Sequence, residues 1–179
     1  MKLLQPWPAG YSINKNSPFG YRKDPITGQK KFHHGIDVAL PVGTPLVAPA
    51  DGKVVHKGSG DSGGNVLIMQ HGPKDFIVFY HLQKPSALKV GDSVKQGQVV
   101  AYSGNTGRST GPHLHMELRN SRNWGDTRNP VPELVSEVEA PAPAPEPVVE
   151  EPKKPSLIGK VAPALAVWQK SWTKRGDKI

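Results

Sequence analysis

The feature that most constrains the fold is a series of short β-prone runs between Gly35 and Leu118, each bounded by glycine or proline. The runs read GIDVAL, GKVVHKG, NVLIMQHG, FIVFYHL, VVAYSG and HLHMEL. Valine, isoleucine, phenylalanine and tyrosine favour strands, and Pro-Val-Gly, Asp-Gly and Ser-Gly-Gly favour the turns between them. No stretch of 12 residues in this region keeps a helical period of apolar side chains. We therefore predict a mainly β domain with antiparallel sheets, one large and one smaller, ending near Leu134.

The composition changes after this domain, and the change divides the chain into three parts. Residues 135–155 read VSEVEAPAPAPEPVVEEPKKP, a proline-rich segment that cannot bury a core and favours an extended linker. The final segment carries apolar and aromatic residues at helical spacing beside several lysines. We predict a folded domain over 1–134, a Pro/Glu/Ala-rich linker over 135–155, and a basic amphipathic tail over 156–179 that forms a short C-terminal helix.

The last β-prone run, RSTGPHLHMEL, places two histidines two residues apart. Side chains alternate between the two faces of a strand, so this run would have an apolar face and a polar face. The apolar face would carry Leu114, Met116 and Leu118. The polar face would carry His113, His115 and Glu117. We predict that the apolar face packs in the core and that the polar face lines a site.

The chain contains no cysteine, so any metal site must use histidine, aspartate or glutamate. A catalytic zinc site needs three protein ligands and one open position. His33 and Asp37, four residues apart, together with His115 would supply such a set. His81, at the end of a strongly β-prone run, and His113 would then flank the open position as acid–base groups and hydrogen-bond donors.

These motifs resemble those of the M23 (lysostaphin-like, LytM-type) zinc metallopeptidases, which cut the peptide cross-links of bacterial peptidoglycan. The stretch FHHGIDVALPVGTPLVAPADGKVV contains H-x-G-x-D, YHL follows, and GPHLHMEL contains H-x-H. The resemblance covers residues 17–134, including the lead-in SPFGYRKDPITG. It implies an antiparallel β-sheet peptidase domain that binds one zinc ion per chain and acts as a metalloendopeptidase on peptidoglycan.

The resemblance also implies a role for each motif residue. The zinc ligands would be His33, Asp37 and His115. The catalytic histidines would be His81 and His113. Glu117, one step further along the same strand face, is a candidate partner for a ligand's imidazole N–H.

The remaining histidines need separate consideration. The doubled histidine at 33–34 lets the motif slip by one residue, but His34 is only three residues before Asp37, so the spacing selects His33. We predict that His34 is simply exposed at the surface. His56 and His71 match no motif position, and we expect both at the surface or in turns.

The formal net charge of +8 has two interpretations: an anionic partner (nucleic acid, a membrane surface or a cell wall), or a domain that is basic without such a partner. The strands lack the aromatic–basic stacking pattern of RNA-recognition sheets, so we predict no nucleic-acid partner. No apolar run approaches the length of a transmembrane helix. An alternative interpretation is a structural or regulatory module of a larger assembly, such as a phage tail component, that uses the same fold for wall or partner binding.

The first residues, MKLLQPWPAGYSINK, lack the apolar run of a secretory signal. A wall-cutting enzyme without such a signal would be phage-encoded, either a virion-borne (tail-associated) lysin or an endolysin that reaches the host periplasm or cell wall during infection or lysis. Residues 156–179 would then dock onto phage tail or other assembly proteins, with contact to a membrane or to wall polymer as the alternative. The sequence leaves open whether the bond cleaved is Gly–Gly or D-alanyl–diaminopimelate, and the Ser-Pro-Phe-Gly-x-Arg lead-in favours the second.

Overall fold

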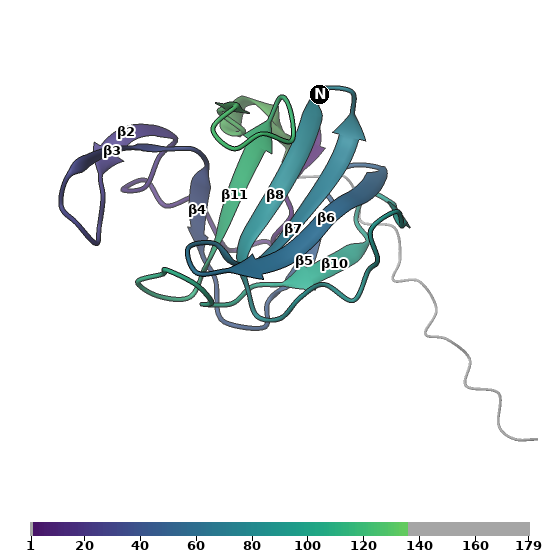
Figure 1. Cartoon of the computed structure of the whole chain (residues 1–179), viewed down its shortest axis with the longest axis horizontal. Helices are drawn as coiled ribbons and strands as arrows, with labels where there is room; N and C mark the ends of the chain where they lie inside the picture. Colours follow the sequence, from purple (N-terminus) through teal and green to yellow (C-terminus); the bar gives the residue numbers. More distant parts are fainter. Residues whose placement is uncertain (1, 136–179) are drawn as a thin grey trace, which may run out of the picture. The chain divides into compact units, whose positions relative to one another are not determined.

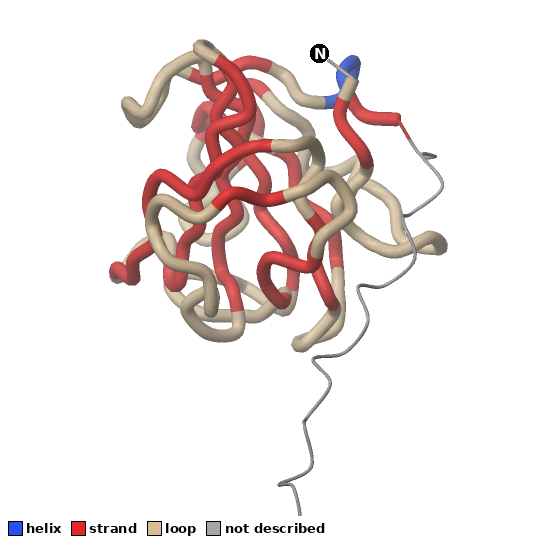
Figure 2. Tube along the Cα trace, turned by 90° about the vertical axis from the view of Figure 1, so that its right-hand side faces the viewer, coloured by secondary structure: helices blue, strands red, loops and turns tan. Residues whose placement is uncertain are grey.

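The computed structural model of this chain describes residues 2–135. Within them it contains thirteen β-strands, one short 3-10 helix and no α-helix, which confirms the prediction of a mainly β fold (Figure 2). Of the linker predicted over 135–155, Val135 belongs to a strand, and residues 136–155 lie outside the described residues, as do the tail and its predicted C-terminal helix. Across residues 2–135, none of the helices has the length and apolar character needed to span a membrane.

The elements follow one another in short succession along the chain. The strands are β1 (Leu3–Leu4), β2 (Gly20–Lys23), β3 (Lys30–His33), β4 (Ile36–Ala39), β5 (Pro45–Val47), β6 (Gly52–Gly60), β7 (Gly64–Gly72), β8 (Asp75–Leu82), β9 (Ser93–Val94), β10 (Val99–Tyr102), β11 (His113–Arg119), β12 (Thr127–Arg128) and β13 (Leu134–Val135). The 3-10 helix η1 spans Val131–Glu133. Each of the six β-prone runs of the sequence forms a strand.

One seven-stranded antiparallel sheet dominates the described fold, in the order β12-β11-β8-β7-β6-β9, with β4 also paired to β11 (Figure 1). Three two-stranded sheets accompany it: β1–β13, β5–β10 and β2–β3. The sequence predicted one smaller sheet, and this prediction is wrong because the described residues form three. The extra pairs join segments that are short or far apart in the sequence, such as Leu3 with Leu134, so periodicity does not reveal them.

The main core lies against one face of the large sheet. Strand β11 contributes Leu114, Met116 and Leu118 to this core, and all three are fully buried, as the alternation predicts. Neighbouring strands add Ile36 and Val38 from β4 and Phe79 from β8. A smaller apolar cluster of Ile68, Phe76 and Val78 lies apart from this core. Strand β11 is thus paired with β4 and β8, and its apolar face packs in the core. Together these contacts fix the position of its polar face.

The lead-in SPFGYRKDPITG forms β2 and the turn that follows it, and β2 pairs with β3 as a hairpin beside β4 (Figure 1). Asp24 stabilises the turn, because its Oδ1 accepts the backbone N–H groups of Ile26 and Thr27, each at 2.9 Å. The hairpin register sets Gly20 opposite His33. This pairing brings the lead-in alongside the first histidine motif.

Candidate metal centre

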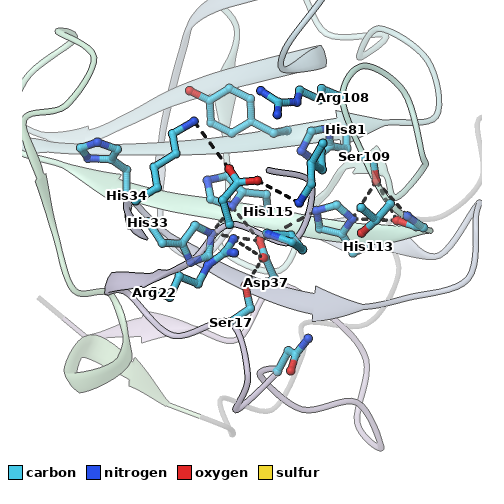
Figure 3. A pocket seen from close by; sticks show the side chains of 18 of the residues that line it. Ser17, Arg22, His33, His34, Asp37, His81, Arg108, Ser109, His113 and His115 are labelled. Carbon is cyan, nitrogen blue, oxygen red and sulfur yellow. Dashed lines mark hydrogen bonds and ion pairs between the residues drawn. The ribbon is translucent and has the colours of Figure 1, made fainter. Parts of the chain in front are cut away.

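Three side chains from three strands converge at one point. His33 Nε2 lies 3.0 Å from His115 Nδ1 and 3.3 Å from Asp37 Oδ1, and His115 Nδ1 lies 2.7 Å from the same Asp37 oxygen. These atoms form a group that could hold a metal ion. Figure 3 shows the three side chains pointing toward one another in the cleft. The structure therefore brings together the three residues that the sequence singles out as ligands.

The strand pairing explains how these residues meet. In the β4–β11 register, Asp37 stands directly opposite His115. Gly35 lies between the first two members of the group, and a Cβ there would come within 2.3 Å of the Met116 carbonyl oxygen and 2.9 Å of the His115 ring. Only glycine lets the chain pass so close to β11. The glycine of H-x-G-x-D is thus required by packing against the H-x-H strand.

Hydrogen bonds on the outer side of each ring set its tautomer. His33 Nδ1 donates to the Pro18 carbonyl oxygen at 2.9 Å, and His115 Nε2 donates to Glu117 Oε1 at 3.3 Å. Each bond leaves the other ring nitrogen facing the centre of the group, where a bound metal ion would take the place of its proton. The pairing of His115 with Glu117 has the geometry expected from their positions on one strand face.

The carboxylate of Asp37 is held in the same way. Its outer oxygen, Oδ2, accepts a hydrogen bond from Ser17 Oγ and lies 3.5 Å from the Arg22 guanidinium. Oδ1 is left to face the two imidazoles. Ser17 and Arg22 thus orient the carboxylate so that one oxygen serves as the ligand atom.

A zinc ion fits this group. Zinc binds imidazole nitrogen and carboxylate oxygen at about 2.0–2.2 Å, so ligand atoms around a tetrahedral ion lie about 3.3 Å apart. The three separations in this structure run from 2.7 to 3.3 Å. Two imidazoles and one carboxylate also match the donors that zinc takes when no cysteine is present. His33, Asp37 and His115 would hold the ion and leave a fourth position toward the cleft.

The electrostatics of the group favour an anionic carboxylate. Burial alone would raise the pKa of Asp37, but hydrogen bonds from His115 and His33 hold that pKa well below its usual range. Burial would likewise lower the pKa of His115, but Asp37 and Glu117 on either side raise it to about 9. The carboxylates therefore stay ionised and attract a cation.

Two further histidines flank the group. The His81 and His113 rings lie 4.7 Å apart, and His113 Nε2 is 3.9 Å from Asp37 Oδ1. In each ring Nδ1 is engaged by a backbone carbonyl at 2.8 Å, that of Thr106 for His81 and that of Gly111 for His113. The Nε2 atoms are therefore the ones available to a substrate. Burial lowers the pKa of His81 to about 4, so its ring is neutral near pH 7.

The backbone of His81 is strained. Among the described residues it is the one non-glycine residue with a positive φ, at 57°. Such a conformation costs about 1–3 kcal/mol and tends to occur at functional sites. It occurs near the end of β8, where the His81 N–H donates to Gly63 and the ring bonds Thr106. These contacts hold the ring beside His113.

A buried ion pair supports the metal group from behind. Arg119 Nε donates to Glu117 Oε2 at 2.6 Å, and both side chains are almost fully buried. The Tyr80 hydroxyl bonds both residues, and burial together with the Glu117 charge raises the pKa of Tyr80 to about 12. Glu117 thus uses one oxygen for Arg119 and the other for His115. Its rigid position fixes the His115 ring.

The metal group opens into a cavity of about 670 Å³. Its walls carry four cationic side chains: Arg22, Lys23, Lys31 and Arg108. Ser17, Asp24 and Ser109 also line it. Lys31 Nζ lies 3.9 Å from Asp24, while Lys23 and Arg108 are exposed. Asp37 and Asp24 thus lie beside Arg22 and Lys31, and the exposed Lys23 and Arg108 are the cationic groups best placed to meet a substrate carboxylate.

The other histidines lie outside the metal group, as the spacing predicts; His56 is exposed as expected, but the settings of His34 and His71 differ from those expected. His34 is half-buried between the rings of Phe32 and Trp124 and bonds Thr127, so the prediction of simple exposure is wrong. His56 is exposed and His71 is half-buried, and both lie within strands rather than turns. Cross-strand contacts of this kind are not visible in local sequence.

The family model for peptidase family M23 matches residues 31–130 of the 179 residues. The chain belongs to peptidase family M23. This membership confirms the resemblance drawn from the motifs and the prediction of an M23-type metallopeptidase domain. The matched range contains the three candidate ligands and both flanking histidines.

Relatives and solved structures agree with this M23 membership. DD-carboxypeptidase/endopeptidase Mpg of Neisseria meningitidis is 42% identical over 116 residues, 65% of this chain and 26% of that protein. A zinc-containing peptidase from Vibrio cholerae is 36% identical, with a TM-score of 0.58 over 66% of this chain and 36% of that one. The catalytic domain of lysostaphin from Staphylococcus simulans is 34% identical, with a TM-score of 0.61 over 68% of this chain and 90% of the domain. The chain spans about a quarter of the length of the curated relatives it matches.

Sequence reasoning missed several residues of the site. Ser17 and Arg22 hold Asp37, while Arg119 and Tyr80 hold Glu117. Ser17 and Arg22 lie in the lead-in that resembles the family, so their location was a usable signal. Arg119 and Tyr80 carried none, because their roles arise from the β8–β11 pairing.

Proposed function

We propose that this M23 protein is a zinc-dependent endopeptidase that cleaves the peptide cross-links of bacterial peptidoglycan. The observation that carries the proposal is the convergence of His33 Nε2, Asp37 Oδ1 and His115 Nδ1 at the base of an open cavity, with two more histidines beside them. When bound there, a zinc ion supplies a Lewis acid that polarises a peptide carbonyl and acidifies water.

The flanking histidines supply the proton chemistry. His113 and His81 each anchor Nδ1 on a backbone carbonyl, so Nε2 can accept a proton from an attacking water or donate one to the leaving nitrogen. A ring that has taken up a proton at Nε2 can then also donate a hydrogen bond to the carbonyl oxygen on which negative charge develops. The ion pair of Glu117 with Arg119 keeps His115 in the tautomer that presents Nδ1.

For the bond cleaved, we propose the direct D-alanyl–diaminopimelate cross-link rather than a glycine bridge. In that cross-link the residue after the scissile amide keeps a free carboxylate, whereas a Gly–Gly bridge has none at the same place. The exposed cationic side chains of Lys23 and Arg108 on the cavity wall favour the carboxylate-bearing substrate. The names of relatives that are DD-carboxypeptidases or DD-endopeptidases also support this choice.

The test is digestion of purified sacculi of both chemistries with the zinc-loaded full chain, followed by mass spectrometry of the new amino termini. We expect diaminopimelate amino groups to appear at the rate of lysis and glycine amino termini to stay at the background level. A chain that releases glycine termini faster would overturn the bond assignment. A chain that lyses neither sacculus with zinc bound would overturn the proposed activity.

The biological setting stays a prediction from the sequence. A phage-encoded origin, as a tail-associated lysin or an endolysin acting at the host periplasm or wall, is our hypothesis, as is docking to assembly proteins through residues 156–179. The alternative of a purely structural or regulatory module is disfavoured by the full set of ligand and acid–base candidates. A truncated chain tests the docking hypothesis. It should end beyond Val135, because β13 pairs with β1, and should still cut soluble cross-linked peptides while losing the partner.

A further inference from the structure

Four aromatic rings form a continuous row beside the metal group. The Tyr21 and Phe32 ring centroids lie 5.1 Å apart, those of Phe32 and His34 4.9 Å, and those of His34 and Trp124 4.8 Å. The row starts on the β2–β3 hairpin and ends on the loop before β12. It thus joins two segments about a hundred residues apart in the sequence into one surface.

The ends of this aromatic row are exposed and its middle is anchored. Tyr21 and Trp124 are each 71% exposed. Phe32 also packs edge-on against Phe19, which contacts the main core, and His34 bonds the Thr127 hydroxyl. Exposed aromatic rings on an ordered support offer apolar ring faces at little entropic cost, which is typical of an interaction site.

The aromatic row is continuous with the proposed catalytic cavity. Phe32, His34 and Trp124 line that cavity together with His33. A substrate peptide bound at the metal group is attached to a polymer, which must leave the cavity over the surrounding surface. The aromatic row is one such exit surface.

We propose that the aromatic row binds the glycan strand of peptidoglycan, with sugar rings stacked on Trp124 and Tyr21. This inference rests on the proposed function. A pyranose ring has an apolar C–H face and a rim of hydroxyls, so it needs a flat aromatic face next to polar groups. Lys30 lies 5.2 Å from the Tyr21 ring, and the exposed Arg122 and Asn123 flank Trp124 in sequence. These groups can bond the hydroxyl rim.

The first test is binding of chitohexaose, a peptide-free oligomer of N-acetylglucosamine, to the full chain by isothermal titration calorimetry. We expect Trp124→Ala and Tyr21→Ala each to weaken binding by about threefold to tenfold, the range of a lost aromatic stacking contact. Tyr102→Ala is the matched control, because Tyr102 is 41% exposed but lies on β10 outside the row. Unchanged affinity in both row variants, or no binding by the wild-type chain, would overturn the proposal.

The second test separates this site from the catalytic one. In Trp124→Ala we expect the ratio of the kcat/KM values on sacculi and on glycan-free cross-linked peptide dimers to fall by a similar factor, and Trp124→Phe to restore it. An unchanged ratio would count against glycan binding. If the chain cleaves neither substrate, the proposed function fails, while chitohexaose binding still reports on the aromatic row. Binding to anionic phospholipid vesicles in place of chitohexaose would overturn the assignment to a sugar.

Discussion

The seven residues of β11 alternate between two faces that serve opposite purposes. One face buries Leu114, Met116 and Leu118 completely and makes no polar contact. The other presents His113, His115 and Glu117 to the cleft and to a network of charges. The comparison shows how a β fold builds a rigid site. Core packing on one face holds the backbone of the strand in place, and the backbone sets the positions from which the side chains of the other face project.

The largest effect should come from removing a ligand on the polar face. His115→Ala should abolish zinc binding and lysis of sacculi together, because two ligands cannot replace three. Zinc content after dialysis, measured by elemental mass spectrometry, and turbidity of sacculi test this expectation. His113→Ala, on the same face two residues away, is the control and should retain one zinc ion per chain. A His115→Ala chain that keeps its zinc would remove His115 from the ligand set.

The next effect should come from the flanking histidines. His113→Ala and His81→Ala should lower kcat by about 10²–10⁴-fold, the usual contribution of general acid–base groups. Neither change should reduce zinc content, since both rings point their free nitrogens at the substrate position. If the rate on cross-linked dimers stays at the wild-type level, the acid–base role assigned to that residue is wrong.

A smaller effect is expected from the support behind the ligands. Glu117→Gln should weaken zinc affinity by about 10–100-fold, because the neutral amide orients the His115 N–H less strongly. Competition with a chromogenic chelator measures this affinity. Tyr80→Phe is the control, since it removes a hydroxyl from the same network and keeps the carboxylate that contacts His115. Equal zinc affinities for the two variants would show that Glu117 does not tune the site.

The apolar face should affect activity least and stability most. Leu114→Ala should lower the free energy of unfolding by about 2–5 kcal/mol, through lost burial and the cavity left behind. The kcat/KM of the folded fraction should change far less than in the His113 variant. Urea denaturation with parallel assays below the midpoint separates the two effects. A loss of activity without a loss of stability would break the division between the faces.

Local sequence predicted much of this molecule because its signals are periodic or chemically specific. The alternation in HLHMEL assigned both faces of β11, and the spacing of H-x-G-x-D separated His33 from His34. The six β-prone runs all became strands, because β-branched and aromatic runs between glycines have few other folded conformations. The sequence by itself also determined the ligand chemistry, since a chain without cysteine has only histidine and carboxylate to offer zinc.

Other features were decided only by the tertiary structure. Which nitrogen of His115 faces the metal was decided by Glu117, and which oxygen of Asp37 does so was decided by Ser17 and Arg22. The aromatic row from Tyr21 to Trp124 exists only because β2–β3 and the loop before β12 meet. Such contacts depend on strand pairing across long sequence separations, and local periodicity carries no information about them.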